Sequence, residues 1–202
     1  MLSVCGNGDV LKPLIILEKT FPLLDEIEAE YLPSDVLLSK TKKGSMELEL
    51  FTDWSKHSII PHKEKVNRDG ISLLILDNHG SRFSTDTIDL CIKNKIEILA
   101  YPGHLTHVLQ GPDVVLNRRI KTIVDNFVHN HLLISGTTIT RLKFINIIDK
   151  AVKDVCTKEL VLKAFSASGC SLLIRTKLIF RGTHQVCHVV LRDPMIQNPP
   201  FV

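Results

Sequence analysis

Apolar runs alternate with amphipathic stretches through the middle of the chain, and this pattern predicts its elements. Residues 71–77 (ISLLILD) and 96–101 (IEILAY) are largely apolar without strict alternation, so we expect two strands that are covered on both faces. Residues 84–94 and 113–130 repeat apolar positions at helical spacing, and Ser84 is the expected N-cap of the first helix. Strands that alternate with helices predict an α/β sheet with helices on both faces.

The spacing also predicts which side chains of these helices face inward. In the first helix we expect Ile88, Cys91 and Ile92 to be buried. The apolar positions of the second helix are Val114, Leu116, Ile120, Val124 and Phe127. Residues 142–165 predict two further helices, and the last 30 residues or so are strand-like in composition.

The beginning of the chain predicts a hairpin. Asn7-Gly8-Asp9 stands between the apolar runs MLSVCG and VLKPLIILE, which is typical of a hairpin turn. Pro13 lacks an amide hydrogen and makes the second strand an edge strand. Residues 21–43 show no regular period, and we expect irregular structure there.

A helix is predicted over residues 45–60, where apolar side chains recur on one face. We expect Ser45 to cap this helix and Pro61 to end it, which leaves residues 61–70 as a polar, basic loop.

Composition narrows the class of protein. With 202 residues, of which 44% are hydrophobic and 23% charged, the chain suits one globular domain, or one domain with an appendage. This composition excludes intrinsic disorder. No apolar run approaches the roughly 18 residues of a membrane span. The net charge of +3 permits an acidic partner without requiring one. The five cysteines are scattered and form no Cys-x-x-Cys, so we expect free thiols in a reducing compartment.

One segment near the end of the chain, THQVCHVV, has residue types that bind zinc. His184, Cys187 and His188 are three candidate ligands in one short stretch, which leaves a zinc site unclosed. The alternating apolar pattern favours an edge strand instead.

Two carboxylates follow the predicted strands. Asp77 ends the strand 71–77, and Asp113 stands at the start of the helix that follows the next strand. Open α/β sheets place ligands at the carboxyl ends of their strands, so we expect the two carboxylates to lie close enough to share one hydrated Mg²⁺. The alternative is that Asp77 only caps a turn and Asp113 only caps a helix.

Two motifs stand in this part of the chain, LDNHGS at residues 76–81 and PGHLTHVLQGPD at residues 102–113. With them, the stretch from Leu73 to Val115 resembles the DDE superfamily endonucleases, specifically the pogo/Tigger type of transposase, to which centromere protein B and jerky-like proteins are related. That family reads Leu-Leu-Leu-Asp-x-His-Gly-Ser-His and later Pro-x-x-Thr-His-x-Leu-Gln-Pro-x-Asp. The first motif is matched by Asp77, His79, Gly80 and Ser81. The second is matched, with one extra residue after the proline, by Pro102, Thr106, His107, Leu109, Gln110 and Asp113.

The resemblance implies an RNase H-like core that cuts DNA with two Mg²⁺ or Mn²⁺ ions held by three acidic residues. Asp77 would be the second of these catalytic metal ligands and Asp113 the third. The supporting residues would be His79, Ser81, Thr106, His107 and Gln110. For His79 and His107 the alternative is a hydrogen-bonded turn residue. The family's partner is DNA, which implies a nuclear location and no membrane association; assembly into a homo-oligomer is left open.

Departures from the family pattern are equally informative. The family's first acidic residue lies on a strand before the opening hairpin, and we expect this central first strand to be missing here. Residues 1–172 would then form a partial catalytic domain and residues 173–202 a divergent tail. Such a site would bind one metal ion weakly, if at all. Arg82 also stands where His is common in the family, and Gly111-Pro112 replaces the usual residues before Asp113.

Three interpretations follow. The chain is an inactive transposase-derived domain, or a domesticated module that keeps the fold to bind DNA or a protein, or part of an active endonuclease whose first carboxylate is encoded before Met1. Nucleic acid would be bound by basic residues, although a solvated surface explains the same charges. These residues are Lys40, Lys42, Lys43, Lys63, Lys65, Arg118 and Arg119.

Overall fold

The computed structural model describes residues 1–19, 31–77, 79–100, 113–167 and 187–191. For residues 113, 114 and 187–191 it describes the course of the backbone only. The strands are β1 (Leu2–Cys5), β2 (Leu14–Glu18), β3 (Leu37–Thr41), β4 (Ser72–Leu76), β5 (Ile96–Ala100) and β6 (Cys187–Leu191).

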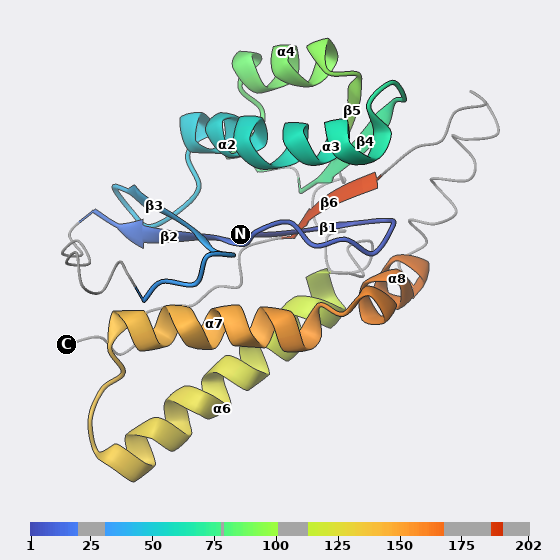
Figure 1. Cartoon of the computed structure of the whole chain (residues 1–202). Coiled ribbons are helices and arrows are strands. Elements are labelled where there is room, and N and C mark those ends of the chain that lie inside the picture. Colours follow the sequence, from blue (N-terminus) through green and yellow to red (C-terminus); the bar gives the residue numbers. More distant parts are fainter. Residues whose placement is uncertain (20–30, 78, 101–112, 168–186, 192–202) are drawn as a thin grey trace.

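The helices form two groups, which lie on opposite sides of the strands in Figure 1. The first group is α2 (Leu48–Trp54), the π-helical turn η1 (Ser55–Ile59), α3 (Ile60–Asn67) and α4 (Thr85–Lys93). The second group is the π-helical turn η3 (Asp113–Asn117), α6 (Arg118–Ser135), α7 (Arg141–Val155) and α8 (Lys158–Ala167). The prediction of a mixed α/β fold with helices on both faces is therefore confirmed.

β4 separates two hydrophobic clusters. Its alternate side chains Leu73 and Ile75 pack with residues of α6, α7 and α8, whereas Leu74 and Leu76 pack with residues of α2, η1 and α4. All four side chains are almost completely buried, with at most 2% of their surface exposed. A strand covered on both faces has no polar side to alternate with, which explains its continuous apolar run.

β6 lies inside the main sheet, whose strand order is β1-β6-β4-β5. It is antiparallel to β1 and parallel to β4, with Val189 opposite both Val4 and Ile75. The prediction of an edge strand for this segment is wrong. The place that we expected to be vacant beside β4 is filled by a strand from the predicted tail. This position gives backbone partners to the facing edges of β1 and β4, which an empty place would leave unpaired.

The opening hairpin is confirmed. The amide of Gly8 donates to the Cys5 carbonyl at 2.9 Å, and the amide of Leu11 donates to the Ser3 carbonyl at 3.0 Å. Gly8 has a φ of +91°, a conformation that favours glycine. The chain then runs into β2, which pairs with β3 in a separate two-stranded parallel sheet. The prediction of irregular structure over residues 21–43 is wrong for β3, and residues 20–30 lie outside the described part of the chain.

The helix predicted over residues 45–60 begins later and runs further. Glu47 is the N-cap of α2, and the chain stays helical through η1 and α3 as far as Asn67. The predictions that Ser45 caps the helix and that Pro61 ends it are wrong, as is the loop predicted after it. Pro61 falls in the first turn of α3, after the wide π-helical turn, where a missing amide hydrogen is tolerated.

Predictions for the later helices are mostly confirmed. Ser84 caps α4, its hydroxyl accepting a hydrogen bond from the Thr87 amide at 3.0 Å. Cys91 is buried, but Ile88 and Ile92 are 40% and 69% exposed, so the inward face of α4 is narrower than its apolar pattern. The two predicted helices after α6 are α7 and α8.

The apolar stripe of α6 is buried only along its first part. Leu116, just before the helix, and Ile120 and Val124 within it lie in the cluster with β4, but Phe127 is 45% exposed. Gly136, with a φ of +64°, ends the helix in the left-handed conformation.

The cysteines whose side chains the structure describes, Cys5, Cys91 and Cys156, are buried thiols that form no disulfide bond. Burial raises the pKa of Cys91 to about 11 and that of Cys156 to about 12, so both remain protonated thiols. None of the described helices is long and apolar enough to cross a membrane.

Candidate functional site

Asp77 follows β4 directly and stands where the parallel strands β4 and β5 end. Its position is fixed by the strand before it, because the side chains of β4 are locked into two hydrophobic clusters. Only 7% of the residue is exposed. A carboxylate this deeply buried requires a compensating charge or several hydrogen bonds.

Arg82 supplies that charge. Its Nε donates a hydrogen bond to Asp77 Oδ1 at 2.5 Å, and it is itself 3% exposed. A second guanidinium nitrogen, Nη1, donates to the sulfur of Met1 at 3.4 Å, and the guanidinium carbon lies 5.4 Å from the centre of the Phe51 ring. The arginine therefore has an anion, a sulfur atom and an aromatic face around it, which together offset part of its loss of water.

A short turn brings Arg82 back to the carboxylate. Residues Gly80–Arg82 form the 3₁₀ turn η2, and the Arg82 amide donates to the His79 carbonyl at 3.0 Å. His79 Nδ1 lies 2.8 Å from the Ser81 hydroxyl and accepts from the Ser81 amide at 3.4 Å. In this structure His79 and Ser81 thus shape the turn, as the alternative interpretation of His79 describes.

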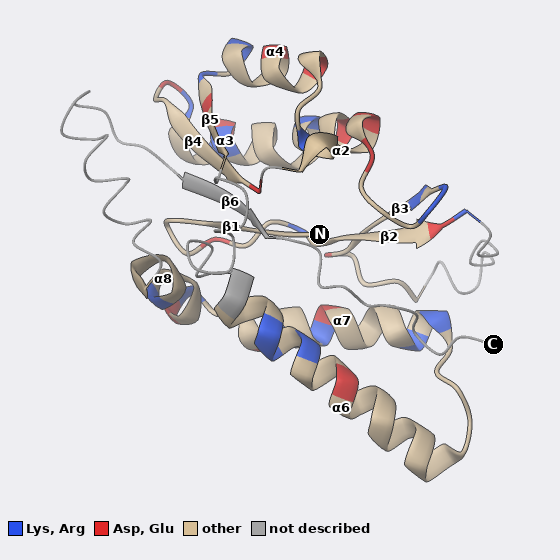
Figure 2. Ribbon diagram, turned by 180° about the vertical axis from the view of Figure 1, so that it is seen from behind, with Lys and Arg blue, Asp and Glu red and all other residues tan. Residues whose placement is uncertain are grey.

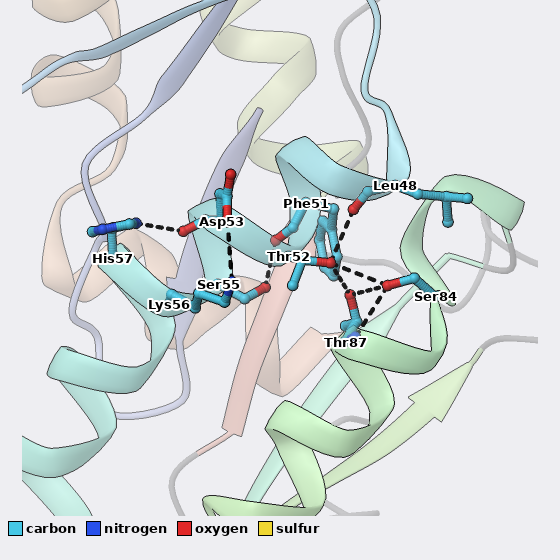
Figure 3. Close-up of polar contacts among 9 residues, drawn as sticks. All are labelled: Leu48, Phe51, Thr52, Asp53, Ser55, Lys56, His57, Ser84 and Thr87. Atoms are coloured by element: carbon cyan, nitrogen blue, oxygen red, sulfur yellow. Dashed lines mark hydrogen bonds and ion pairs between the residues drawn. The ribbon is translucent and has the colours of Figure 1, made fainter.

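A cluster of hydroxyl groups holds the end of the loop that follows the turn, at Ser84 (Figure 3). Thr52 Oγ1 lies 2.7 Å from Thr87 Oγ1 and 3.1 Å from Ser84 Oγ, and so joins α2 to the start of α4. The residue before Thr52 is Phe51, whose ring lies under Arg82. One turn of α2 therefore holds both the arginine and the end of the loop that carries it.

The second motif lies largely outside the described residues. Thr106, His107 and Gln110 belong to the segment 101–112, and Asp113 is described only as the first backbone position of η3. η3 leads directly into α6, as the predicted helix from residue 113 requires. The expected approach of the Asp113 carboxylate to Asp77 remains a prediction.

The described residues do not fit a Mg²⁺ ion at Asp77. One carboxylate oxygen is already bound to Arg82, and Mg²⁺ needs carboxylate oxygens together with its own water molecules. No three His, Cys, Asp or Glu side chains of the described residues are grouped closely enough to hold a metal ion. The neighbouring strand β6 has the sequence Cys-His-Val-Val-Leu and contributes no carboxylate within its bounds.

The predicted nucleic-acid-binding residues fall on separate elements. Lys40, Lys42 and Lys43 lie on β3 and in the turn after it, and Figure 2 shows β3 well apart from α6. Lys65 is exposed on α3. Lys63 is only 3% exposed, and its ammonium donates to the Arg68 carbonyl at 2.8 Å. Burial, with the nearby Lys95, lowers the pKa of Lys63. Because the ammonium group is buried and hydrogen-bonded within the chain, this side chain does not belong to a phosphate-binding surface.

Arg118 and Arg119 border an open groove of about 820 Å³ between the start of α6, the end of α7 and α8. Lys163 lies in the same groove, but so do Asp154 and Glu159. The Lys163 ammonium is 2.7 Å from a Glu159 carboxylate oxygen. The groove therefore carries charges of both signs and is not a dedicated anion site.

The sequence did not predict a second polar group, which joins the hairpin to α3. His62 Nε2 lies 3.1 Å from Asp9 Oδ2, and His62 Nδ1 lies 3.8 Å from the Cys5 sulfur. Partial burial acts to raise the pKa of Asp9, but hydrogen bonds from Asn7 and His62 outweigh it and lower that pKa. Burial raises the pKa of Cys5 far above its usual range, so this arrangement holds a neutral thiol and not a nucleophile.

The contact between Asp77 and Arg82 predicts strong energetic coupling. We expect Asp77→Asn and Arg82→Leu each to lower the free energy of unfolding by about 3–5 kcal/mol, because each leaves a buried charge without its partner. The double variant should lose less than the sum of the two by about 2–3 kcal/mol. Denaturant unfolding of the four proteins measures this coupling.

The exposed pair Glu159–Lys163 is the matched control, and the corresponding cycle of Glu159→Gln and Lys163→Met should show no measurable coupling. Strictly additive losses at Asp77 and Arg82 would contradict the buried ion pair.

Comparison with known proteins agrees with the resemblance to the DDE superfamily. A family model described as DDE superfamily endonuclease matches residues 1–165. Among curated proteins, the MFS-type transporter clz9 of Cochliobolus lunatus is 26% identical over 174 residues, a match that covers 83% of this chain and 18% of that protein. The chain thus spans less than a fifth of the length of this relative. No solved structure matches the chain significantly. Because the family match covers most of the chain and includes the segment around Asp77, the chain belongs to the DDE superfamily endonucleases.

Proposed function

We propose that this chain is a transposase-derived DDE domain of the pogo/Tigger type that binds DNA and does not cut or join it by itself. The observation that carries this proposal is the state of the motif carboxylate. Asp77 is buried and its charge is neutralised by Arg82 of the same chain. DDE chemistry requires acidic residues that are available to metal ions, and this carboxylate is already engaged.

The architecture supports an RNase H-like core. β4 and β5 are parallel, the motif aspartate follows β4, and helices cover both faces of the mixed sheet. The sequence resembles both motifs of the pogo/Tigger type, although the residues of the second lie mostly outside the described part of the chain. In this proposal Asp113 is the remaining motif carboxylate, and the chain alone binds Mg²⁺ or Mn²⁺ weakly.

DNA binding is proposed to depend on phosphate contacts. The exposed lysines Lys42 and Lys43 follow β3 in a turn at Gly44, which has a φ of +64°. Arg118 and Arg119 add an exposed basic pair at the start of α6. Contacts of this kind are sensitive to salt and carry little sequence information, so we propose weak binding that does not depend strongly on DNA sequence. With DNA as its partner, we propose that the protein acts in the nucleus.

A domesticated protein-binding module is the second candidate, and the end of α6 favours it. Leu132, Leu133 and Ile134 are 47%, 69% and 88% exposed. Consecutive exposed apolar side chains are typical of surfaces that contact other proteins. This function is compatible with DNA binding, because the apolar residues lie at the opposite end of α6 from Arg118 and Arg119.

The binding proposal predicts a change in salt dependence. For Lys42→Ala/Lys43→Ala, the slope of log K for duplex DNA against log salt concentration should become shallower by about 2, because two phosphate contacts are lost. Fluorescence anisotropy at several salt concentrations measures the slope. The matched control is Lys56→Ala/Lys93→Ala, which makes the same change of net charge on α4 and η1. Equal effects of both variants would show a response to net charge alone and contradict contacts at the β3 turn.

The catalytic proposal predicts no cleavage. The full chain, incubated with labelled DNA and Mg²⁺ or Mn²⁺, should release no more product than Asp77→Ala does, because the carboxylate at this position is held by Arg82. Gel analysis of single-strand nicks, double-strand breaks and joined products measures this. Cleavage by the unmodified chain that both Asp77→Ala and Asp113→Ala abolish would establish an active site and overturn the proposal.

A further inference from the structure

We propose that Arg82 is the resident cation of the Asp77 carboxylate and excludes divalent metal ions from it. Identifying Asp77 as the motif carboxylate rests on the proposed function. The exclusion itself rests on the geometry of a buried ion pair: Nε of Arg82 and Oδ1 of Asp77 are 2.5 Å apart, and the two side chains are only 3% and 10% exposed.

The charge of the guanidinium is permanent. The guanidinium group of arginine is always charged in proteins, so Asp77 faces a positive charge. A metal ion has to displace this hydrogen bond or bind beside it. Binding beside it places two positive charges close together in a buried site, where water screens their repulsion poorly.

Displacement is opposed by the other contacts of Arg82. Its guanidinium also donates to the Met1 sulfur at 3.4 Å and lies over the Phe51 ring. If the arginine moved away from Asp77, it would lose all three partners at once. The backbone of the turn is fixed as well, since the Arg82 and Phe83 amides donate to the carbonyls of His79 and Gly80. A rotation of the Arg82 side chain that exposes the Asp77 carboxylate therefore also breaks the other contacts of the guanidinium group.

The residue type at position 82 decides which cation the carboxylate holds. Histidine, which is common at this position in the resembling family, is shorter than arginine and is neutral over much of the physiological pH range. A neutral side chain leaves the negative charge of Asp77 to a metal ion. Arginine instead compensates that charge within the chain, so the domain keeps its fold in the absence of metal.

Binding of Mn²⁺ to the full chain, followed by electron paramagnetic resonance, tests this exclusion. The unmodified chain and Asp77→Asn should bind Mn²⁺ equally weakly. Arg82→His should bind it at least about tenfold more tightly, the smallest effect typical of a residue that supports a metal ligand. Arg82→His/Asp77→Asn should return to the affinity of the unmodified chain. Arg68→His, at an exposed arginine, is the matched control and should change nothing.

A second measurement needs no variant to fold. In ¹⁵N-resolved NMR spectra of the unmodified chain, Mn²⁺ should not selectively broaden the amide signals of Leu76 and Arg82. Selective broadening there, or binding by the unmodified chain that Asp77→Asn abolishes, would overturn the exclusion. So would a folded Arg82→His variant that binds Mn²⁺ no more tightly than the unmodified chain.

These outcomes are independent of DNA cleavage. Mn²⁺ bound at Asp77 without DNA cleavage would refute the exclusion and leave the proposed function standing. DNA cleavage without Mn²⁺ at Asp77 would refute the proposed function and leave the exclusion standing.

Discussion

The burial of β4 on both faces is the constraint on which the rest of the structure depends. Leu73 and Ile75 belong to one hydrophobic cluster and Leu74 and Leu76 to the other, so the helices on both faces pack against the same strand. Its backbone is paired on both sides, with β5 and with β6. A strand held in this way has little freedom to shift, because a slip of one residue would exchange the side chains between the two clusters.

That rigidity determines what happens at Asp77. The strand delivers a carboxylate to a place that is almost closed to water, and the carboxylate requires a positive partner there. Either a metal ion or a side chain can meet this requirement. In this chain the turn η2 returns Arg82 to the carboxylate, and α2 provides the Phe51 ring beneath it. The hydroxyl cluster of Thr52, Ser84 and Thr87 then holds α2 and α4 together around the loop.

Local signals in the sequence predicted most of the elements. The hairpin at Gly8, the cap at Ser84 and the apolar run of β4 depend on neighbouring residues, and all are found in the structure. The strand β3 and the helical continuation through Pro61 were missed, because tertiary pairing and a π-helical turn override the local preference. The exposure of Ile92 was missed for a related reason: helical spacing defines a face but not how far a neighbour covers it.

Long-range pairing was the main limit of prediction. Nothing near Val189 in the sequence specifies that its strand lies between β1 and β4, because the partners are more than a hundred residues away. The candidate site shows the same limit. The motif identified Asp77 and drew attention to Arg82 as a departure from the family, but a sequence does not show that two side chains five residues apart turn toward each other. Lys63 was assigned to a basic surface for the same reason, since its burial depends on the packing of α3.

The central claim is that an arginine, and not a metal ion, neutralises the motif carboxylate. A crystal structure of the full chain grown with Mn²⁺, with anomalous difference density collected near the manganese edge, tests it most directly. The account predicts no anomalous peak within coordination distance of the Asp77 carboxylate and an Arg82 side chain hydrogen-bonded to it. A manganese ion bound to Asp77, with Arg82 turned away from it, would contradict the account.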